Sequence, residues 1–198
     1  MPFEIWFEFA STYSYLTVSR AEAMLRERQI KFQWRPFLLG PIFRDQGLTT
    51  SPFVLHADKG AYMWRDLERR AARFGLPFRR PPVFPANGLR AARVMTAAQA
   101  EPWSGDFARR VFAAQFAEGR DISRSETLAQ ALQGCGAAPE VWLAAAEKPG
   151  TKAQLRANTD RARALGVFGA PSFVVNDELF WGDDRLEDAL AWASATGA

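Results

Sequence analysis

The sequence has little of the chemistry on which most redox, metal and hydrolytic sites depend. Its 198 residues include one cysteine, Cys135, and one histidine, His56. A single cysteine forms neither an internal disulfide nor a C-x-x-C redox pair. A zinc site would need carboxylate ligands, and a Ser-His-Asp or Cys-His site would have to use His56. We interpret Cys135, which lies between two glycines, as an inert loop cysteine, and we predict no metal site.

Long apolar runs are also missing. No apolar stretch approaches the ~18 residues that a membrane-spanning helix needs. The first residues lack the basic start and apolar core of a signal peptide, so we expect a cytoplasmic protein that binds no membrane. Apolar residues still make up 48% of the chain and aromatics 13%, which is too hydrophobic for disorder. The length predicts one domain, or one domain that carries an insertion.

Charge of either sign is nearly balanced overall but unevenly distributed. The net charge of +3 is too small to indicate a nucleic-acid-binding protein. Residues 61–93 hold eight arginines against two acids, whereas residues 176–189 hold six acids against one arginine. Two interpretations stay open. The runs are solvated helix faces, or they steer an anionic ligand or pair two subunits.

The hydrophobic pattern predicts strands at both ends of the chain and helices between them. Residues 3–9 are expected to form a strand and residues 13–28 a helix, with Ser11 or Thr12 as its N-cap. Residues 30–37 form the second strand, parallel to the first. Further helices are expected at 61–74, 89–100, 104–118, 124–132, 139–146, 152–165 and from 182 to about 195, and a hairpin is expected at 172–176 and 178–181.

This order of elements predicts an α/β protein with the thioredoxin fold. Residues 1–37 and 166–198 form the thioredoxin-like domain and together supply a four-stranded sheet. Residues 38–165 form a large all-helical insertion.

Three turns at one edge of this sheet carry the predicted site. The turn after the first strand reads Ser-Thr-Tyr-Ser from Ser11 to Ser14, where a redox enzyme would have its two cysteines. A helix N-terminus favours an anion, so Ser11 could hold the thiolate of another molecule and lower its pKa. The alternative is an ordinary helix cap.

The other two turns offer backbone groups and charge. Ala170-Pro171 precedes the third strand, where this fold usually has a cis proline, and an extended peptide could pair with the backbone there. The alternative is an ordinary proline at a strand start. Gly182, Asp183 and Asp184 could together bind both charges of an α-amino acid end. The alternative there is simple helix capping by either acid.

Six segments, in order along nearly the whole chain, resemble the 2-hydroxychromene-2-carboxylate isomerases. This family is related to kappa-class glutathione transferases and to DsbA-like disulfide oxidoreductases. The matching segments are residues 7–16 (FEFASTYSYL), 35–39 (RPFLL), 59–63 (KGAYM), 84–87 (FPAN), 166–171 (GVFGAP) and 181–185 (WGDDR).

The resemblance implies glutathione as the cofactor. Ser11 would contact its sulfur, and the backbone of Ala170, before Pro171, would pair with its cysteinyl unit. The segment Gly182, Asp183, Asp184 would bind the γ-glutamyl end. Lys59 would match a lysine that faces glutathione in kappa-class enzymes.

The resemblance also implies the reaction. The glutathione thiolate adds to a conjugated carbon of a small aromatic substrate, the new single bond rotates, and the thiolate leaves. Asn87 would match a substrate-side asparagine, although Asn before Gly is also a plain turn residue. Phe43 and Phe53 stand where the naphthalene-pathway isomerase has a lysine and an asparagine beside the substrate. Arg44 is the neighbouring cation.

We therefore predict a glutathione-dependent isomerase, with two alternatives. One is a kappa-like transferase or peroxidase that acts on another electrophile. The other is a non-catalytic thioredoxin-like module that binds peptides along the Pro171 edge. The related families also imply a homodimer.

Overall fold

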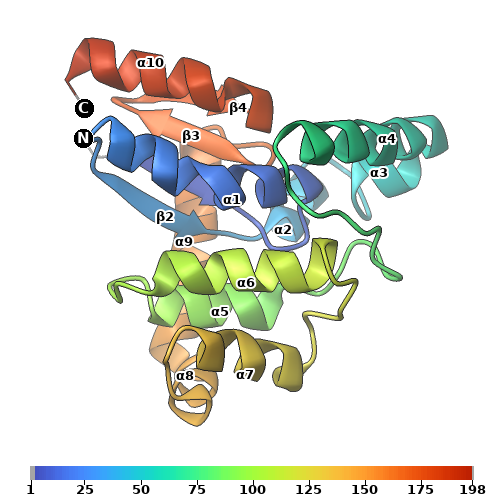
Figure 1. Ribbon diagram of the computed structural model, residues 1–198, viewed down its shortest axis with the longest axis vertical. Coiled ribbons are helices and arrows are strands. Elements are labelled where there is room, and N and C mark those ends of the chain that lie inside the picture. The colour runs from blue at the N-terminus through green and yellow to red at the C-terminus, as the bar shows by residue number, and fades with distance from the viewer. Residues whose placement is uncertain (1–2, 198) are drawn as a thin grey trace.

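A sheet of four strands organises the computed structural model, which describes residues 3–197 (Figure 1). The strand order is β2-β1-β3-β4. Strand β1 pairs in parallel with β2, whereas β3 runs antiparallel to β1 and β4 antiparallel to β3. These strands are Phe3–Phe7, Phe32–Pro36, Ser172–Val175 and Glu178–Trp181 in chain order. The predicted thioredoxin fold is therefore confirmed, including the parallel opening pair and the terminal hairpin.

The helices follow the hydrophobic pattern with small shifts at their ends. Two differences have local causes. A short helix precedes the one expected from residue 61, because Ser51 caps it and Pro52 occupies its first turn. A 3-10 turn, Asp183–Arg185, precedes the last helix. The helices are α1 Thr12–Glu27, α2 Leu39–Asp45, α3 Pro52–Leu55, α4 Ala57–Arg73, α5 Leu89–Ala97, α6 Ser104–Phe116, α7 Ser125–Gly134, α8 Pro139–Ala145, α9 Pro149–Ala164 and α10 Leu186–Thr196.

Both faces of β1 are covered, which accounts for its nearly unbroken apolar sequence. Phe3, Ile5 and Phe7 point into the main core, which also includes residues of α1, α6 and α10. Trp6 points to the opposite face and packs with Ala162 of α9 in a second, smaller core. Alternate residues of a strand face opposite sides, so a strand in the middle of a sandwich has to be apolar on both.

Helix α9 belongs to the predicted insertion by sequence but covers the sheet. The Asn158 amide donates to the carbonyl of Pro36 over 3.1 Å, and the N–H of Leu38 donates to the Thr159 hydroxyl over 3.2 Å. Arg161 reaches Glu4 on β1 at 2.9 Å. Helices α5 to α8 of the predicted insertion lie below the sheet in Figure 1, and α3 and α4 lie to its right. Among the described residues, no helix has the length and apolar character needed to span a bilayer.

Candidate active site at the start of helix α1

The Ser11 hydroxyl lies at the N-terminus of α1 and contacts a segment 159 positions away in the sequence. It accepts a hydrogen bond from the N–H of Ser14 at 3.2 Å, as the N-cap does. It also donates to the carbonyl of Ala170 at 2.9 Å. A hydroxyl that donates to a carbonyl can turn its proton to an incoming anion while it still accepts the capping bond. Ser11 is therefore both the predicted cap and a donor at the positive end of a 16-residue helix.

The Ala170–Pro171 peptide bond is cis, as expected for this position of the fold. Among the described residues, the N–H of Ala170 has no hydrogen-bond acceptor. Gly169, before it, is packed against Trp181 so closely that a β-carbon would lie 2.3 Å from the indole Nε1. The turn thus presents a free backbone donor next to the Ser11 hydroxyl, and a side chain at position 169 would require the Trp181 indole to shift.

The two acids of the third turn have different surroundings. Asp183 is 1% exposed. Its carboxylate accepts hydrogen bonds from Thr17 at 2.8 Å, from Arg20 at 3.0 Å and from Arg70 at 2.5 Å. The Asp184 side chain keeps 53% of its surface exposed and faces Arg185 at 3.3 Å.

The structure therefore distinguishes the two acids that the sequence pattern treats alike. No side chain caps the 3-10 turn, so the capping interpretation is wrong for this turn. Asp183 has its oxygens committed to protein groups. Asp184 is the acid whose carboxylate remains accessible to a ligand.

One face of helix α4 contacts the start of α1 and the turn that holds Asp183. Met63, Asp66 and Arg70 are spaced three and four apart, so they line one side of the helix. The Thr12 hydroxyl contacts the Met63 sulfur at 3.3 Å, and the Tyr13 hydroxyl donates to Asp66 at 2.9 Å. Burial, and then the Asp66 carboxylate, hold the pKa of Tyr13 above its usual value. Tyr13 is therefore a neutral hydrogen-bond donor at physiological pH.

Aromatic rings surround the same turn. The ring of Phe53 lies 6.3 Å from that of Tyr13, which brings Phe53 to the predicted substrate side. Phe43 lies on α2, and among the described residues its ring makes no aromatic contact. The structure thus places the ring of Phe53 against Tyr13 of the turn.

The loop before α5 closes the other side of the turn. A β-carbon on Gly88 would lie 2.9 Å from Cβ of Phe9, so this loop abuts the end of β1. The side-chain carbonyl of the exposed Asn87 accepts from the N–H of Leu89 at 3.1 Å, which is the turn role left open by the sequence. Phe84 packs edge-on against Trp64 of α4, with ring centroids 4.9 Å apart.

Glu8 is a candidate site residue that the sequence reasoning missed. One of its oxygens accepts from the N–H of Ala10 at 3.0 Å, and the other faces Gly88. No cation of the described residues pairs with it. Burial raises the pKa of this carboxyl to about 8, with the Ala10 bond opposing the rise. The sequence feature that could have identified Glu8 is its position between two phenylalanines, Phe7 and Phe9, at the end of the apolar first strand.

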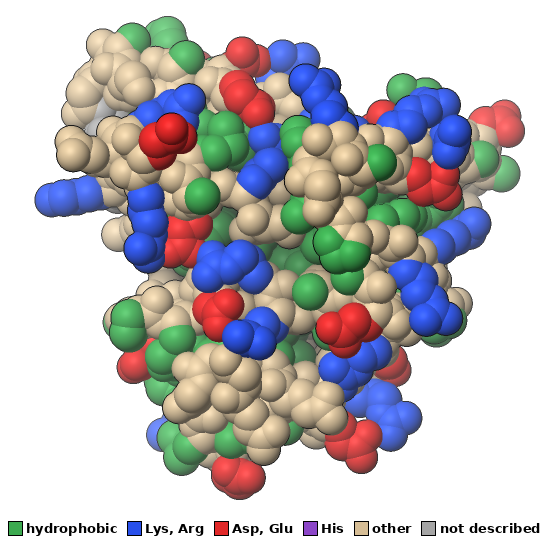
Figure 2. Space-filling model, viewed as in Figure 1, with side chains coloured by type: hydrophobic (Ala, Val, Ile, Leu, Met, Phe, Trp, Pro, Cys, Tyr) green, Lys and Arg blue, Asp and Glu red, His purple; other side chains and the backbone are tan. Residues whose placement is uncertain are grey.

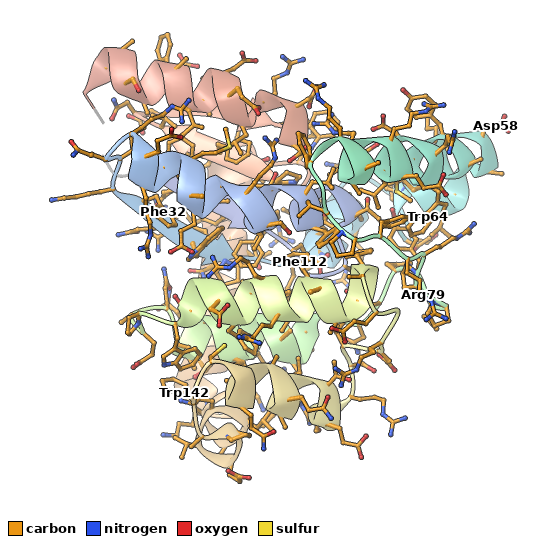
Figure 3. All side chains as sticks on the ribbon, in the orientation of Figure 1. Phe32, Asp58, Trp64, Arg79, Phe112 and Trp142 are labelled. Atoms are coloured by element: carbon orange, nitrogen blue, oxygen red, sulfur yellow. The ribbon has the colours of Figure 1, made fainter. Side chains whose placement is uncertain are left out.

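Among the described residues, three further candidates from the sequence make no hydrogen bond or ion pair with Ser11, Ala170 or Asp184. Lys59 is exposed in the first turn of α4, beside Asp58, which Figure 3 labels at the outer end of that helix. His56 is exposed where α3 meets α4. Burial, and then Asp106, raise the pKa of the Cys135 thiol to about 11, which fits an inert cysteine. No group of metal-binding side chains occurs within residues 3–197.

The fold and site define a thioredoxin-fold protein whose helix N-terminus carries a serine in place of redox cysteines. The chain belongs to the family of DSBA-like thioredoxin domains, whose model matches residues 3–191. It is similar to the 2-hydroxychromene-2-carboxylate isomerase of Sphingobium xenophagum, with 24% identity over 93% of each chain.

A second relative and a solved structure agree with this placement. The human glutathione S-transferase kappa 1 is 27% identical over 93% of this chain and 87% of the transferase. The structure of a 2-hydroxychromene-2-carboxylate isomerase superposes with a TM-score of 0.87 and 23% identity, covering 100% of this chain and 95% of the isomerase. Both curated relatives are enzymes by name.

Proposed function

We propose that this protein is a glutathione-dependent isomerase that acts on small aromatic compounds of the 2-hydroxychromene-2-carboxylate type. The observation that carries the proposal is the Ser11 hydroxyl, placed at a helix N-terminus against the cis-proline turn, while the single cysteine of the chain lies at the end of α7. Such a site stabilises a thiolate but has none of its own. The nucleophile therefore has to arrive with a bound thiol, and the kappa-class relative is a glutathione transferase.

The residues present fit glutathione. Ser11 would donate a hydrogen bond to the sulfur, and the free N–H of Ala170 would pair with the cysteinyl backbone. The accessible carboxylate of Asp184 would hold the γ-glutamyl ammonium group, while the buried Asp183 holds the turn in place through Thr17, Arg20 and Arg70. Bound glutathione would supply a thiolate that adds reversibly to the conjugated double bond.

The protein's own contribution is to stabilise charge and orient the reactants. The N-terminus of α1 and the Ser11 hydroxyl increase the fraction of thiolate at neutral pH. Phe53 and Tyr13 offer aromatic surface on which a planar ring can lie. We further infer a homodimer, which light scattering on the purified protein tests, and a cytoplasmic location, which fractionation of the source cells tests.

The test is a calorimetric titration with reduced glutathione in two buffers of different ionisation enthalpy. Wild-type protein should bind glutathione and release a proton as the thiol ionises. Ser11→Ala should lose most of the proton release. Ser19→Ala should behave as wild type, because the Ser19 hydroxyl donates to the Tyr15 carbonyl within the same helix. Failure to bind at millimolar glutathione would overturn the proposal.

The kappa-class relative favours one second candidate, a glutathione transferase. The product distinguishes the two reactions. An isomerase returns glutathione unchanged, whereas a transferase leaves it covalently attached to the electrophile. Mass spectrometry of the reaction mixture with a conjugated aromatic pyruvate therefore decides between them.

A further inference from the structure

Arg80 is an arginine without an acidic partner. Most arginines of this chain have a carboxylate within 4.0 Å. Within the described part of the chain, the arginines that have none are Arg44, Arg69, Arg73, Arg79, Arg80 and Arg156. Four of these lie in the basic run of residues 61–93, so this run is more than a helix face neutralised by its own acids.

The guanidinium of Arg80 is held over an aromatic ring that belongs to the site region. Its Cζ lies 4.8 Å from the centroid of the Trp64 ring. Trp64 is buried and is itself fixed by Phe84 and by Phe78, whose ring lies 6.3 Å away. A guanidinium held over a fixed ring loses little freedom when it binds an anion, and its N–H donors make no hydrogen bond to the described residues.

Trp64 connects Arg80 to the predicted site on two sides. Its neighbour Met63 contacts Thr12, the first residue of α1 after the Ser11 cap. Its ring partner Phe84 begins the loop that ends at Gly88, against Phe9 and Ala10. Figure 3 shows Trp64 and Arg79, the neighbour of Arg80, on the same side of the molecule below α4. Figure 2 shows positive and hydrophobic side chains together over this edge.

We propose that Arg80 binds the carboxylate of the aromatic substrate and so sets the preference of this site for anionic electrophiles. This inference rests on the proposed function. The aromatic rings receive the apolar part of the substrate, and Arg80 receives its charged end.

The test compares two substrates that differ in the charged group. One is o-hydroxybenzylidenepyruvate, and the other is o-hydroxybenzylideneacetone, in which a methyl group replaces the carboxylate. The variants are Arg80→Gln, Arg80→Lys and a matched control, Arg73→Gln, which removes another unpaired arginine from the same basic run. Rates are measured with saturating glutathione, and binding of each compound is measured by calorimetry with S-methylglutathione present.

We expect Arg80→Gln to lower kcat/KM for the pyruvate about tenfold, mainly through KM, as for the loss of a hydrogen bond to a charged group. The decrease in kcat/KM for the methyl ketone should be at least fivefold smaller. Raising the salt concentration should reduce the difference in kcat/KM for the pyruvate between wild type and Arg80→Gln. Arg80→Lys should retain part of the wild-type kcat/KM for the pyruvate, because lysine keeps the positive charge but lacks the planar guanidinium.

Equal decreases in kcat/KM for the pyruvate in Arg80→Gln and Arg73→Gln would overturn the proposal. They would show that the positive potential of the whole basic run attracts the substrate, without a specific contact at Arg80. Equal decreases for both substrates would also overturn the proposal. A wild-type protein that binds the pyruvate but does not isomerise it would refute the proposed reaction. In that case weaker binding by Arg80→Gln would still support the carboxylate site, and unchanged binding would refute it. No binding of the pyruvate at millimolar concentration would refute both.

Discussion

The raised pKa of Glu8 makes a prediction about stability that can be worked out in sign and size. Glu8 has an ordinary pKa near 4.5 in the unfolded chain and about 8 in the folded protein. Between these values the folded state keeps a proton that the unfolded state has lost. The free energy of unfolding therefore falls as the pH rises from about 4.5 to about 8, and it is independent of Glu8 outside that window.

The size follows from about 1.4 kcal/mol per pH unit, which gives at most about 5 kcal/mol across this window. Part of the Glu8 residue remains accessible to solvent, which weakens the effect. We therefore expect a loss of about 2–3 kcal/mol in the wild type between pH 5 and pH 8.

Glu8→Gln removes the titration and keeps an oxygen to accept the Ala10 N–H. Urea unfolding followed by tryptophan fluorescence at constant ionic strength, at half-unit steps from pH 5 to pH 9, measures the effect. The Glu8→Gln profile should be flatter than the wild-type profile by the expected amount. Glu178→Gln, which changes an exposed acid on the edge strand β4, is the control and should leave the wild-type slope. Parallel profiles for wild type and Glu8→Gln would show that Glu8 ionises normally in the folded protein and would refute the reasoning.

Other variants test the remaining contacts. Asp183→Asn should lower the free energy of unfolding by about 3–5 kcal/mol, because it leaves Arg70 of a partly buried network without a charge partner and leaves Arg20 with Glu187 alone; a change under 1 kcal/mol by urea unfolding would contradict this. Asp184→Asn should change stability by less than about 0.5 kcal/mol but weaken glutathione binding in calorimetry, and unaltered binding would remove Asp184 from the site. Ser11→Ala should lose about 1 kcal/mol through the missing cap. Gly169→Ala should lower the thermal midpoint, since its methyl group would meet Trp181 at 2.3 Å; an unchanged midpoint would show that the indole moves freely.

Local features of the fold could be predicted from the sequence because they depend on neighbouring residues. The apolar strand at residues 3–7, the Ser11 cap and the hairpin turn at Asn176 and Asp177 each follow from periodicity or from the preferences of turn residues. The lack of a second cysteine by itself excludes a C-x-x-C redox pair. The hydrophobic pattern does not fix the helix ends, since tertiary contacts and short capped turns such as Ser51–Pro52 decide them.

The arrangement of the site depends on contacts between distant segments, which only the tertiary structure decides. Ser11 meets Ala170 across 159 positions because β1 and β3 are neighbours in the sheet. Asp183 and Asp184 are adjacent and chemically identical, yet one is buried under two arginines and the other remains exposed. The pKa of Glu8 and the position of Arg80 on Trp64 likewise result from what packs around them. Desolvation and ion pairing act through space, so residue identity determines which groups can react, and packing determines which of them face a ligand.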